Sequence, residues 1–240
     1  MIQLNAEQRD AVNYDGHLVI TACPGSGKTR VLTARAIRGL GELQSRRERV
    51  VALTFTNRAA DEIQTRLDHE DVDSSHLWAG TIHAFALEWI LRPYAPYSDI
   101  CRCGFSVADE FYTEQLLSEL KEEAGLPAYA DVHTVITRKG HTENPDEGAR
   151  AVFERYKERL REARLIDYDD VLYLTYKILV DNPECAATLG SIIRLLCVDE
   201  VQDIQDLQYS ILSAIFKKSA LPLGEHPKPA IHDHLKTGQR

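Results

Sequence analysis

Two short stretches of this chain carry residue types suited to phosphate chemistry. The first joins a glycine-rich turn to a cation and a hydroxyl: Gly25, Ser26, Gly27, Lys28 and Thr29. Backbone N–H groups of such a turn can surround phosphate oxygens, while the lysine reaches the outer phosphates and the threonine hydroxyl binds Mg²⁺. The second stretch, Asp199-Glu200, follows an apolar run. One such carboxylate can bind Mg²⁺ and the other can orient or deprotonate a water molecule.

Plainer interpretations exist for each stretch. The general phosphate-loop pattern G-x-x-x-x-G-K-[ST] has glycine where this chain has Ala22. The alternative interpretation of the first stretch is a glycine-rich turn with an incidental lysine. The acidic pair alone is equally typical of a solvated strand end. The occurrence of both stretches in one chain favours a nucleotide site.

The elements around these stretches predict an α/β fold with a parallel sheet flanked by helices. Continuous apolar, β-branched runs are typical of strands buried on both faces. They are expected at 17–22, 49–56, 77–82 and 192–198. Helical spacing of apolar residues occupies 5–14, 28–40 and 58–67 and continues from about residue 83. Strands that alternate with helices favour a parallel sheet covered on both sides.

The chain changes character from about residue 92, which predicts an inserted, mostly helical subdomain at 92–164. Charged helices are expected at 109–125 and 146–164. These helices could lie along duplex DNA, but a solvated face is the favoured interpretation for most of Arg155, Lys157, Arg159 and Arg161. The sheet-forming domain then comprises 1–91 and 165–219. The last segment, 220–240, has no periodicity and is expected to be disordered.

Composition limits where the chain works and what it binds. It has 240 residues with 37 acidic and 28 basic side chains, a formal net charge of -9, so any nucleic-acid contact must be local. Five cysteines and a polar N-terminus fit a reducing cytoplasm, and the sequence holds no membrane span. Cys101 and Cys103 lack a second ligand pair at zinc spacing, so we expect no zinc site there.

The two chemical stretches together resemble the superfamily 1 DNA helicases of the UvrD/Rep/PcrA type, whose phosphate loop itself tends to begin with alanine. Further segments match in chain order: Leu4–Val12 the adenine-reading Q motif, Leu53–Ala60 motif Ia, Gly80–Phe85 motif Ib, Ile166–Leu172 the D-F-x-D-L segment, and Gln208 the sequel to motif II. Ordered matches of this kind are highly specific.

The resemblance implies a RecA-like P-loop domain that uses ATP and Mg²⁺, with the insertion equivalent to the family's 1B subdomain. The implied nucleotide-binding residues are Gln8, Ala22, Gly25, Ser26, Gly27, Lys28, Thr29, Arg30 and Gln202. Among the active-site residues, Lys28, Asp199 and Glu200 would be catalytic, and Thr29 and Asp199 would hold the metal. The implied contacts to single-stranded or partly duplex DNA are Thr56, Asn57, Arg58, Thr81 and His83.

Each implied role has a structural alternative. The alternative for Gln8 is that it closes a helix capping box with Asn5, and this role is compatible with contact to adenine. The alternative for the polar residues after the second and third expected strands is helix capping. Phe85 is expected to be a core residue rather than a base-stacking one.

The family would continue beyond residue 219 into motif III and a second RecA-like domain, and this sequence has neither. The expected function is therefore the ATP-binding lobe of a helicase, from a gene interrupted by a frameshift or an early stop. The first alternative is a nucleotide-dependent DNA-binding module that works with a second polypeptide in a repair or defence complex. The second is an unrelated P-loop ATPase.

Overall fold

The computed structural model describes residues 2–16, 18–21, 23, 25–144 and 146–216. Ala22, which belongs to the predicted phosphate loop, and the predicted disordered tail at 220–240 lie outside the described residues.

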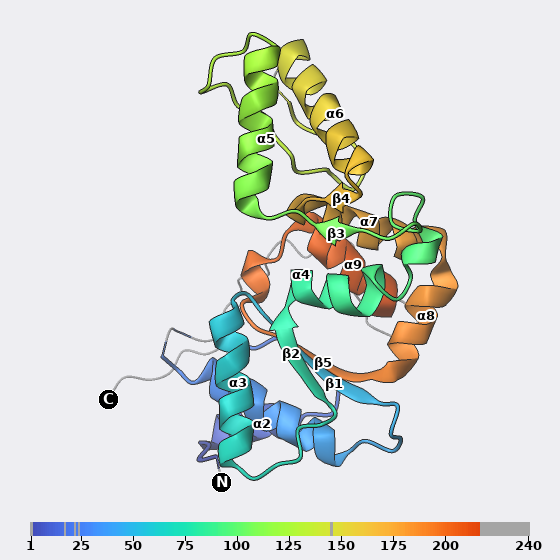
Figure 1. The fold of residues 1–240 in the computed structure, drawn as a ribbon. Helices are drawn as coiled ribbons and strands as arrows, with labels where there is room; N and C mark the ends of the chain where they lie inside the picture. Colours follow the sequence, from blue (N-terminus) through green and yellow to red (C-terminus); the bar gives the residue numbers. More distant parts are fainter. Residues whose placement is uncertain (1, 17, 22, 24, 145, 217–240) are drawn as a thin grey trace.

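A three-stranded parallel sheet lies at the centre of the described fold (Figure 1). Strand β1 (Arg49–Thr54) lies between β2 (Leu77–Thr81) and β5 (Ile193–Val198). Because successive side chains of a strand point to opposite faces, β1 supplies both sides of the core. Val51 and Leu53 join one hydrophobic cluster, whereas Ala52 joins another.

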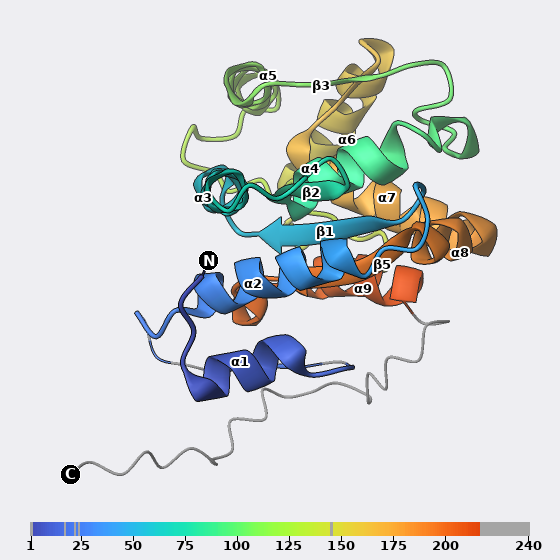
Figure 2. The ribbon, with the colours of Figure 1, turned by 90° about the horizontal axis from the view of Figure 1, so that it is seen from below.

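Helices α2 (Lys28–Gly41) and α3 (Asn57–His69) cover the face of the sheet on which Ala52 lies. Ile63 and Leu67 of α3 lie one helical turn apart and are fully buried there. The short helix α1 (Ala6–Asn13) packs on the far side of α2 through Val12, so α2 lies between α1 and the sheet (Figure 2).

The other face of the sheet is covered by a group of helices that surround Val51 and Leu53. They are α4 (Ile82–Phe85), the π-helical turn η1 (Ala86–Leu91), α7 (Tyr168–Asp181), α8 (Pro183–Ile192) and α9 (Asp206–Phe216). Phe85 is fully buried among them, which confirms its predicted core position.

A helical hairpin extends away from the sheet (Figure 1). It is formed by α5 (Glu110–Glu123) and α6 (Glu147–Glu162), which share a small apolar core of their own around Leu120 and Tyr156. At its base β3 (Ser106–Val107) pairs in parallel with β4 (Leu165–Ile166). We refer to α5, α6 and the segment between them as the helical projection. Two 3₁₀ turns complete the described elements, η2 (Ala95–Tyr97) and η3 (Val201–Asp203).

The α/β class and the parallel, helix-flanked sheet predicted from the sequence are confirmed, but the first expected strand is wrong. Residues 18–21 are irregular, and the side chain of Val19 is 79% exposed. Val19 and Ile20 have high β-propensity, but that preference expresses fit to a neighbouring strand. In the described part of the sheet this run has no strand beside it.

The expected solvated face of the second charged helix is also wrong at one position. Lys157 of α6 is 5% exposed, and its ammonium group lies 2.7 Å from an oxygen of Asp167 and 2.8 Å from one of Asp170. A lysine this deeply buried requires ionic partners, which the helical periodicity of α6 alone does not reveal.

Two general features concern the described residues. No helix among them is long and apolar enough to cross a membrane. The five cysteines are all free thiols, and burial raises the pKa of Cys197, on β5, to about 12.

Two glycines of α2 give a test of how closely this helix approaches the sheet. A Cβ on Gly39 would lie 2.5 Å from Leu195 Cδ2, whereas a Cβ on Gly41 would meet nothing within 4 Å. We expect Gly41→Ala to increase the free energy of unfolding by about 0.5–1 kcal/mol, because alanine loses less backbone entropy. Gly39→Ala is expected to decrease it by about 1–3 kcal/mol through overpacking.

Urea unfolding of both variants measures this difference. Equal stabilisation by the two substitutions would contradict the close packing of α2 on β1 and β5.

Candidate functional site

The glycine-rich turn has a left-handed backbone at both of its glycines. Gly25 and Gly27 have φ values of 79° and 91°, in the left-handed region that glycine enters without strain. The Ser26 N–H donates to the carbonyl oxygen of Cys23 at 3.1 Å, which closes the turn, and Gly27 immediately precedes α2. The turn therefore leads directly into the N-terminus of α2, where backbone N–H groups and the helix dipole favour an anion.

The turn opens into a cleft of about 580 Å³ that also receives the loop after β5. Seven of the residues that line this cleft were predicted from the sequence to bind nucleotide or to be catalytic: Gly25, Gly27, Lys28, Thr29, Arg30, Glu200 and Gln202. The eighth lining residue, Arg66, was not predicted. Two segments distant in sequence thus bring a lysine and a hydroxyl to a carboxylate and an amide.

The acidic pair is held by backbone geometry at the end of β5. The Asp199 N–H donates to the carbonyl oxygen of Leu53 at 2.8 Å, and the Asp199 carboxylate accepts the Glu200 N–H at 3.1 Å. Glu200 has a φ of 50°, which is uncommon for a residue with a side chain. Its carboxylate accepts a hydrogen bond from the Gln202 amide.

Burial and repulsion by Glu200 raise the pKa of Asp199, while the positive charge of Lys28 lowers it. The charge of Lys28, on the glycine-rich turn, therefore acts on the acidic pair after β5.

Gln8 links the N-terminal segment to the phosphate loop. Its side-chain oxygen accepts the Asn5 N–H at 3.0 Å and Asn5 accepts the Gln8 N–H, so the capping-box alternative is present. The Gln8 amide nitrogen also donates to the carbonyl oxygen of Ser26 at 2.9 Å. The same side chain therefore begins α1 and contacts the turn that is suited to phosphates.

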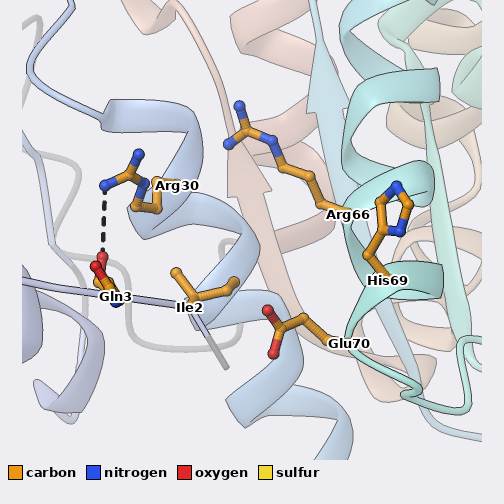
Figure 3. Close-up of a pocket in the computed structure, with 6 residues that line it drawn as sticks. All are labelled: Ile2, Gln3, Arg30, Arg66, His69 and Glu70. Atoms are coloured by element: carbon orange, nitrogen blue, oxygen red, sulfur yellow. Dashed lines mark hydrogen bonds between the residues drawn. The ribbon is translucent and has the colours of Figure 1, made fainter.

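A second hollow of about 370 Å³ shares two arginines with the cleft (Figure 3). It is lined by Ile2, Gln3, Arg30, Arg66, His69 and Glu70. Arg30 donates to the backbone oxygen of Gln3 at 3.5 Å, and Arg66 reaches in from α3.

Sequence reasoning missed Arg66. Its position four residues after Glu62, with which it forms an ion pair, looks like an ordinary surface pair along a helix. Only the packing of α3 beside α2 brings it to the cleft.

The residues expected to contact DNA follow β1 and β2. Thr56 caps α3 by accepting the Ala59 N–H, and Thr81 caps α4 by accepting the Ala84 N–H, both at 3.2 Å. The capping alternative is therefore present for both threonines, and their role toward DNA stays a prediction. Asn57 and Arg58 are exposed in the first turn of α3.

His83 stacks on an aromatic residue that sequence reasoning did not select. Its ring lies 4.0 Å from that of Tyr168, centroid to centroid, with 17° between the planes. Tyr168 is 56% exposed, and Phe55, just after β1, is 66% exposed. Exposed aromatic rings near strand ends are suited to stacking on nucleic-acid bases. An aromatic residue at the first position of a helix gave no signal that it would meet His83.

The described residues contain no group of three or more His, Cys, Asp or Glu side chains arranged to hold a metal ion. Mg²⁺ is commonly held by one or two protein carboxylates together with phosphate oxygens and water, so Asp199 and Thr29 are a donor set that fits a phosphate-bound metal.

Comparison of the sequence with models of known protein families shows which family the chain is related to. The model of the UvrD/REP helicase N-terminal domain matches residues 4–223, which include the glycine-rich turn, the acidic pair and both candidate DNA loops. The chain belongs to this helicase family. The UvrD/Rep membership predicted from the ordered motifs is therefore confirmed.

Curated relatives of this UvrD/Rep domain include ATP-dependent DNA helicase UvrD1 of Mycobacterium tuberculosis, 32% identical over 92% of this chain. ATP-dependent DNA helicase Rep of Escherichia coli is 31% identical over 89% of it, and PcrA of Leuconostoc citreum is 30% identical over 90%. The chain covers 32%, 34% and 31% of these relatives, about a third of their length.

The partial burial of His83 in this UvrD/Rep domain predicts how the stability of the chain depends on pH. Burial lowers its pKa below the ordinary value of about 6.5, and the nearby charge of Asp169 only partly opposes this. The unfolded chain therefore binds this proton more readily, so the contribution to stability is present above about pH 6.5 and is lost as the pH falls below it.

We expect the urea midpoint of the wild type to fall more between pH 7.5 and pH 5 than that of His83→Asn. The same substitution at the exposed His141 serves as the control. Parallel pH profiles for the wild type and His83→Asn would contradict the burial of this imidazole.

Proposed function

We propose that this chain is the ATP-binding lobe of a UvrD-like DNA helicase, with a RecA-like P-loop fold and the segment 92–164 as its helical insertion. The main support is the cleft in which the glycine turn and Lys28 face the acidic loop after β5. Its relatives are named ATP-dependent DNA helicases, which gives independent support.

The cleft residues divide the work of nucleotide binding. The backbone of Gly25 to Lys28 surrounds the phosphates, and the Lys28 ammonium group contacts the outermost ones. Thr29 and Asp199 are the residues that would hold Mg²⁺, which would supply positive charge to the phosphate oxygens. The Glu200 carboxylate orients the attacking water and accepts its proton, and Gln202 holds that carboxylate in place.

Arg66 adds a further cation to the phosphate end of the cleft, which Lys28 and Arg30 also line. It lines the same cleft as Lys28, and its partner Glu62 leaves the guanidinium group with further donors. A guanidinium group can stabilise charge on a phosphate through two parallel hydrogen bonds. Arg30 lines the same cleft, and Gln8 donates to the carbonyl oxygen of Ser26 in the glycine turn, so these two residues are the candidates for contacts to the base.

The loops after β1 and β2 form the proposed surface for single-stranded DNA. The exposed residues Asn57 and Arg58 are the candidates for binding backbone phosphates. The exposed ring of Phe55 and the Tyr168–His83 stack are the candidates for stacking on bases. Because the chain has a net charge of -9, this contact must depend on local cations.

ATP turnover tests the proposal as a whole. Purified chain should bind Mg·ATP and hydrolyse it faster when an oligothymidine of about 20 nucleotides is present. Lys28→Ala should abolish binding, since the phosphates lose their main cation. Glu200→Gln should keep binding and reduce turnover by about 10²-fold or more, because the amide cannot accept a proton.

The pattern of results separates two functions. Nucleotide and DNA binding without turnover would favour a nucleotide-dependent DNA-binding module. Absence of nucleotide binding in the wild type would contradict the proposal.

Arg66 gives a separate test of the phosphate end. Arg66→Ala should weaken binding of fluorescent ATP by about tenfold, while affinity for the nucleoside adenosine stays unchanged. Arg102→Ala is the matched control, since Arg102 also forms an ion pair on its own segment but lies away from the cleft. Equal losses for ATP and adenosine would show that Arg66 acts on fold rather than on phosphate.

A further inference from the structure

Lys157 forms the centre of a buried ionic cluster where the helical projection meets α7. Its ammonium group donates to Asp167 Oδ2 at 2.7 Å and to Asp170 Oδ1 at 2.8 Å. The hydroxyl of Tyr156 donates to the same Asp167 oxygen at 3.0 Å. All four side chains belong to buried residues, and nothing in the nucleotide cleft uses them.

The two carboxylates also build the first turn of α7. Asp167 accepts the Asp170 N–H at 2.8 Å, and Asp170 accepts the Asp167 N–H at 3.2 Å, which completes a capping box. Each carboxylate therefore bonds both to the backbone of α7 and to Lys157 of α6. A change in the position of Lys157 would alter the start of α7 directly.

Tyr168 is the first residue of this turn, between the two carboxylates in sequence. Asp169, the next residue, accepts a hydrogen bond at 2.6 Å from the hydroxyl of Thr134, which belongs to the segment between α5 and α6. The helical projection therefore contacts α7 on both sides of Tyr168. His83, by contrast, lies in α4 directly after β2 of the central sheet.

The energetics favour a role in geometry rather than in bulk stability. Removing charged groups from water is expensive, and well-packed apolar side chains often stabilise a core as much as a buried ion pair does. Burial raises the pKa of Asp170, and the Lys157 charge opposes that effect. The cluster differs from apolar packing in that its hydrogen bonds are directional, so they allow only one arrangement of the first turn of α7.

We propose that Lys157 is a positioning residue for DNA binding, which holds the first turn of α7 so that Tyr168 stacks on His83 and presents a base-binding face. The helical projection thereby controls this face. The inference rests on the proposed binding of single-stranded DNA. It adds Lys157, which lies 10 positions before Asp167 in the sequence, to the residues on which DNA binding depends, although Lys157 does not contact the DNA.

A double-mutant cycle tests whether Lys157 acts through Tyr168. Affinity for fluorescein-labelled oligothymidine is measured by anisotropy for Tyr168→Ala, Lys157→Met and the double variant. Each single variant should lose about tenfold in affinity, as expected for one base stack. The double variant should lose no more than Tyr168→Ala alone. Independent losses that multiply would overturn the proposal, as would unchanged affinity in Lys157→Met.

Two further variants separate positioning from misfolding. Lys177→Met replaces an exposed lysine of α7 that pairs with Asp181, and should leave affinity unchanged. Asp170→Asn keeps the contact of Lys157 with Asp167 but offers one acceptor oxygen for two donors, so it should give a smaller loss, about threefold, in a chain that still folds. Circular dichroism and urea unfolding check the fold of each variant.

A DNA-independent measurement distinguishes failure of this inference from failure of the proposed function. The His83 ring protons should be shifted upfield in the NMR spectrum by the Tyr168 ring, and Tyr168→Ala should remove that shift. Asp170→Asn and Lys157→Met should move it toward the Tyr168→Ala value. Wild-type chain that shows these shifts but binds no DNA would contradict the DNA-binding proposal alone, whereas an unchanged His83 shift in both cluster variants would contradict the positioning role.

Discussion

The hydrogen bond from the Asp199 N–H to the Leu53 carbonyl oxygen extends the pairing of β5 with β1 by one residue past the end of the strand. It determines where the backbone leaves the sheet and therefore where the acidic pair points. Because β1 is packed on both faces, it cannot slide without disturbing two hydrophobic clusters. The relation of Asp199 to Lys28 thus depends on core packing, although both lie in loops or at a helix end. A cleft assembled from distant segments gains its geometry from this sheet.

The parts that the sequence predicted well are those governed by local pattern. The strand at 49–54 follows from its continuous apolar run, and the buried helix face around Ile63 and Leu67 follows from helical spacing. The glycine turn was predictable because left-handed φ values restrict residue choice. The prediction of a strand at 18–21 was wrong for the opposite reason. A strand needs a neighbouring strand to pair with, and the apolar composition of a segment does not show whether one is present.

The site residues that escaped sequence reasoning depend on contacts between elements. Arg66 and Lys157 each lie on a charged helix with ordinary neighbours, and nothing in their own segments separates them from solvated side chains. Tyr168 was hidden similarly, because its partner His83 follows another strand. Charged and aromatic residues on helices gain their roles from the surfaces that meet them, whereas loop motifs carry their chemistry within a few consecutive positions.

The left-handed backbone of Glu200 has a consequence for protein engineering. A residue with a side chain costs about 1–2 kcal/mol in this conformation, and glycine would relieve most of that cost. Selection for thermal tolerance alone would therefore favour losing the carboxylate at this position. Keeping Glu200 in an active enzyme would therefore mean accepting lower thermal stability in return for its carboxylate. Directed evolution of a heat-resistant form should hold position 200 fixed.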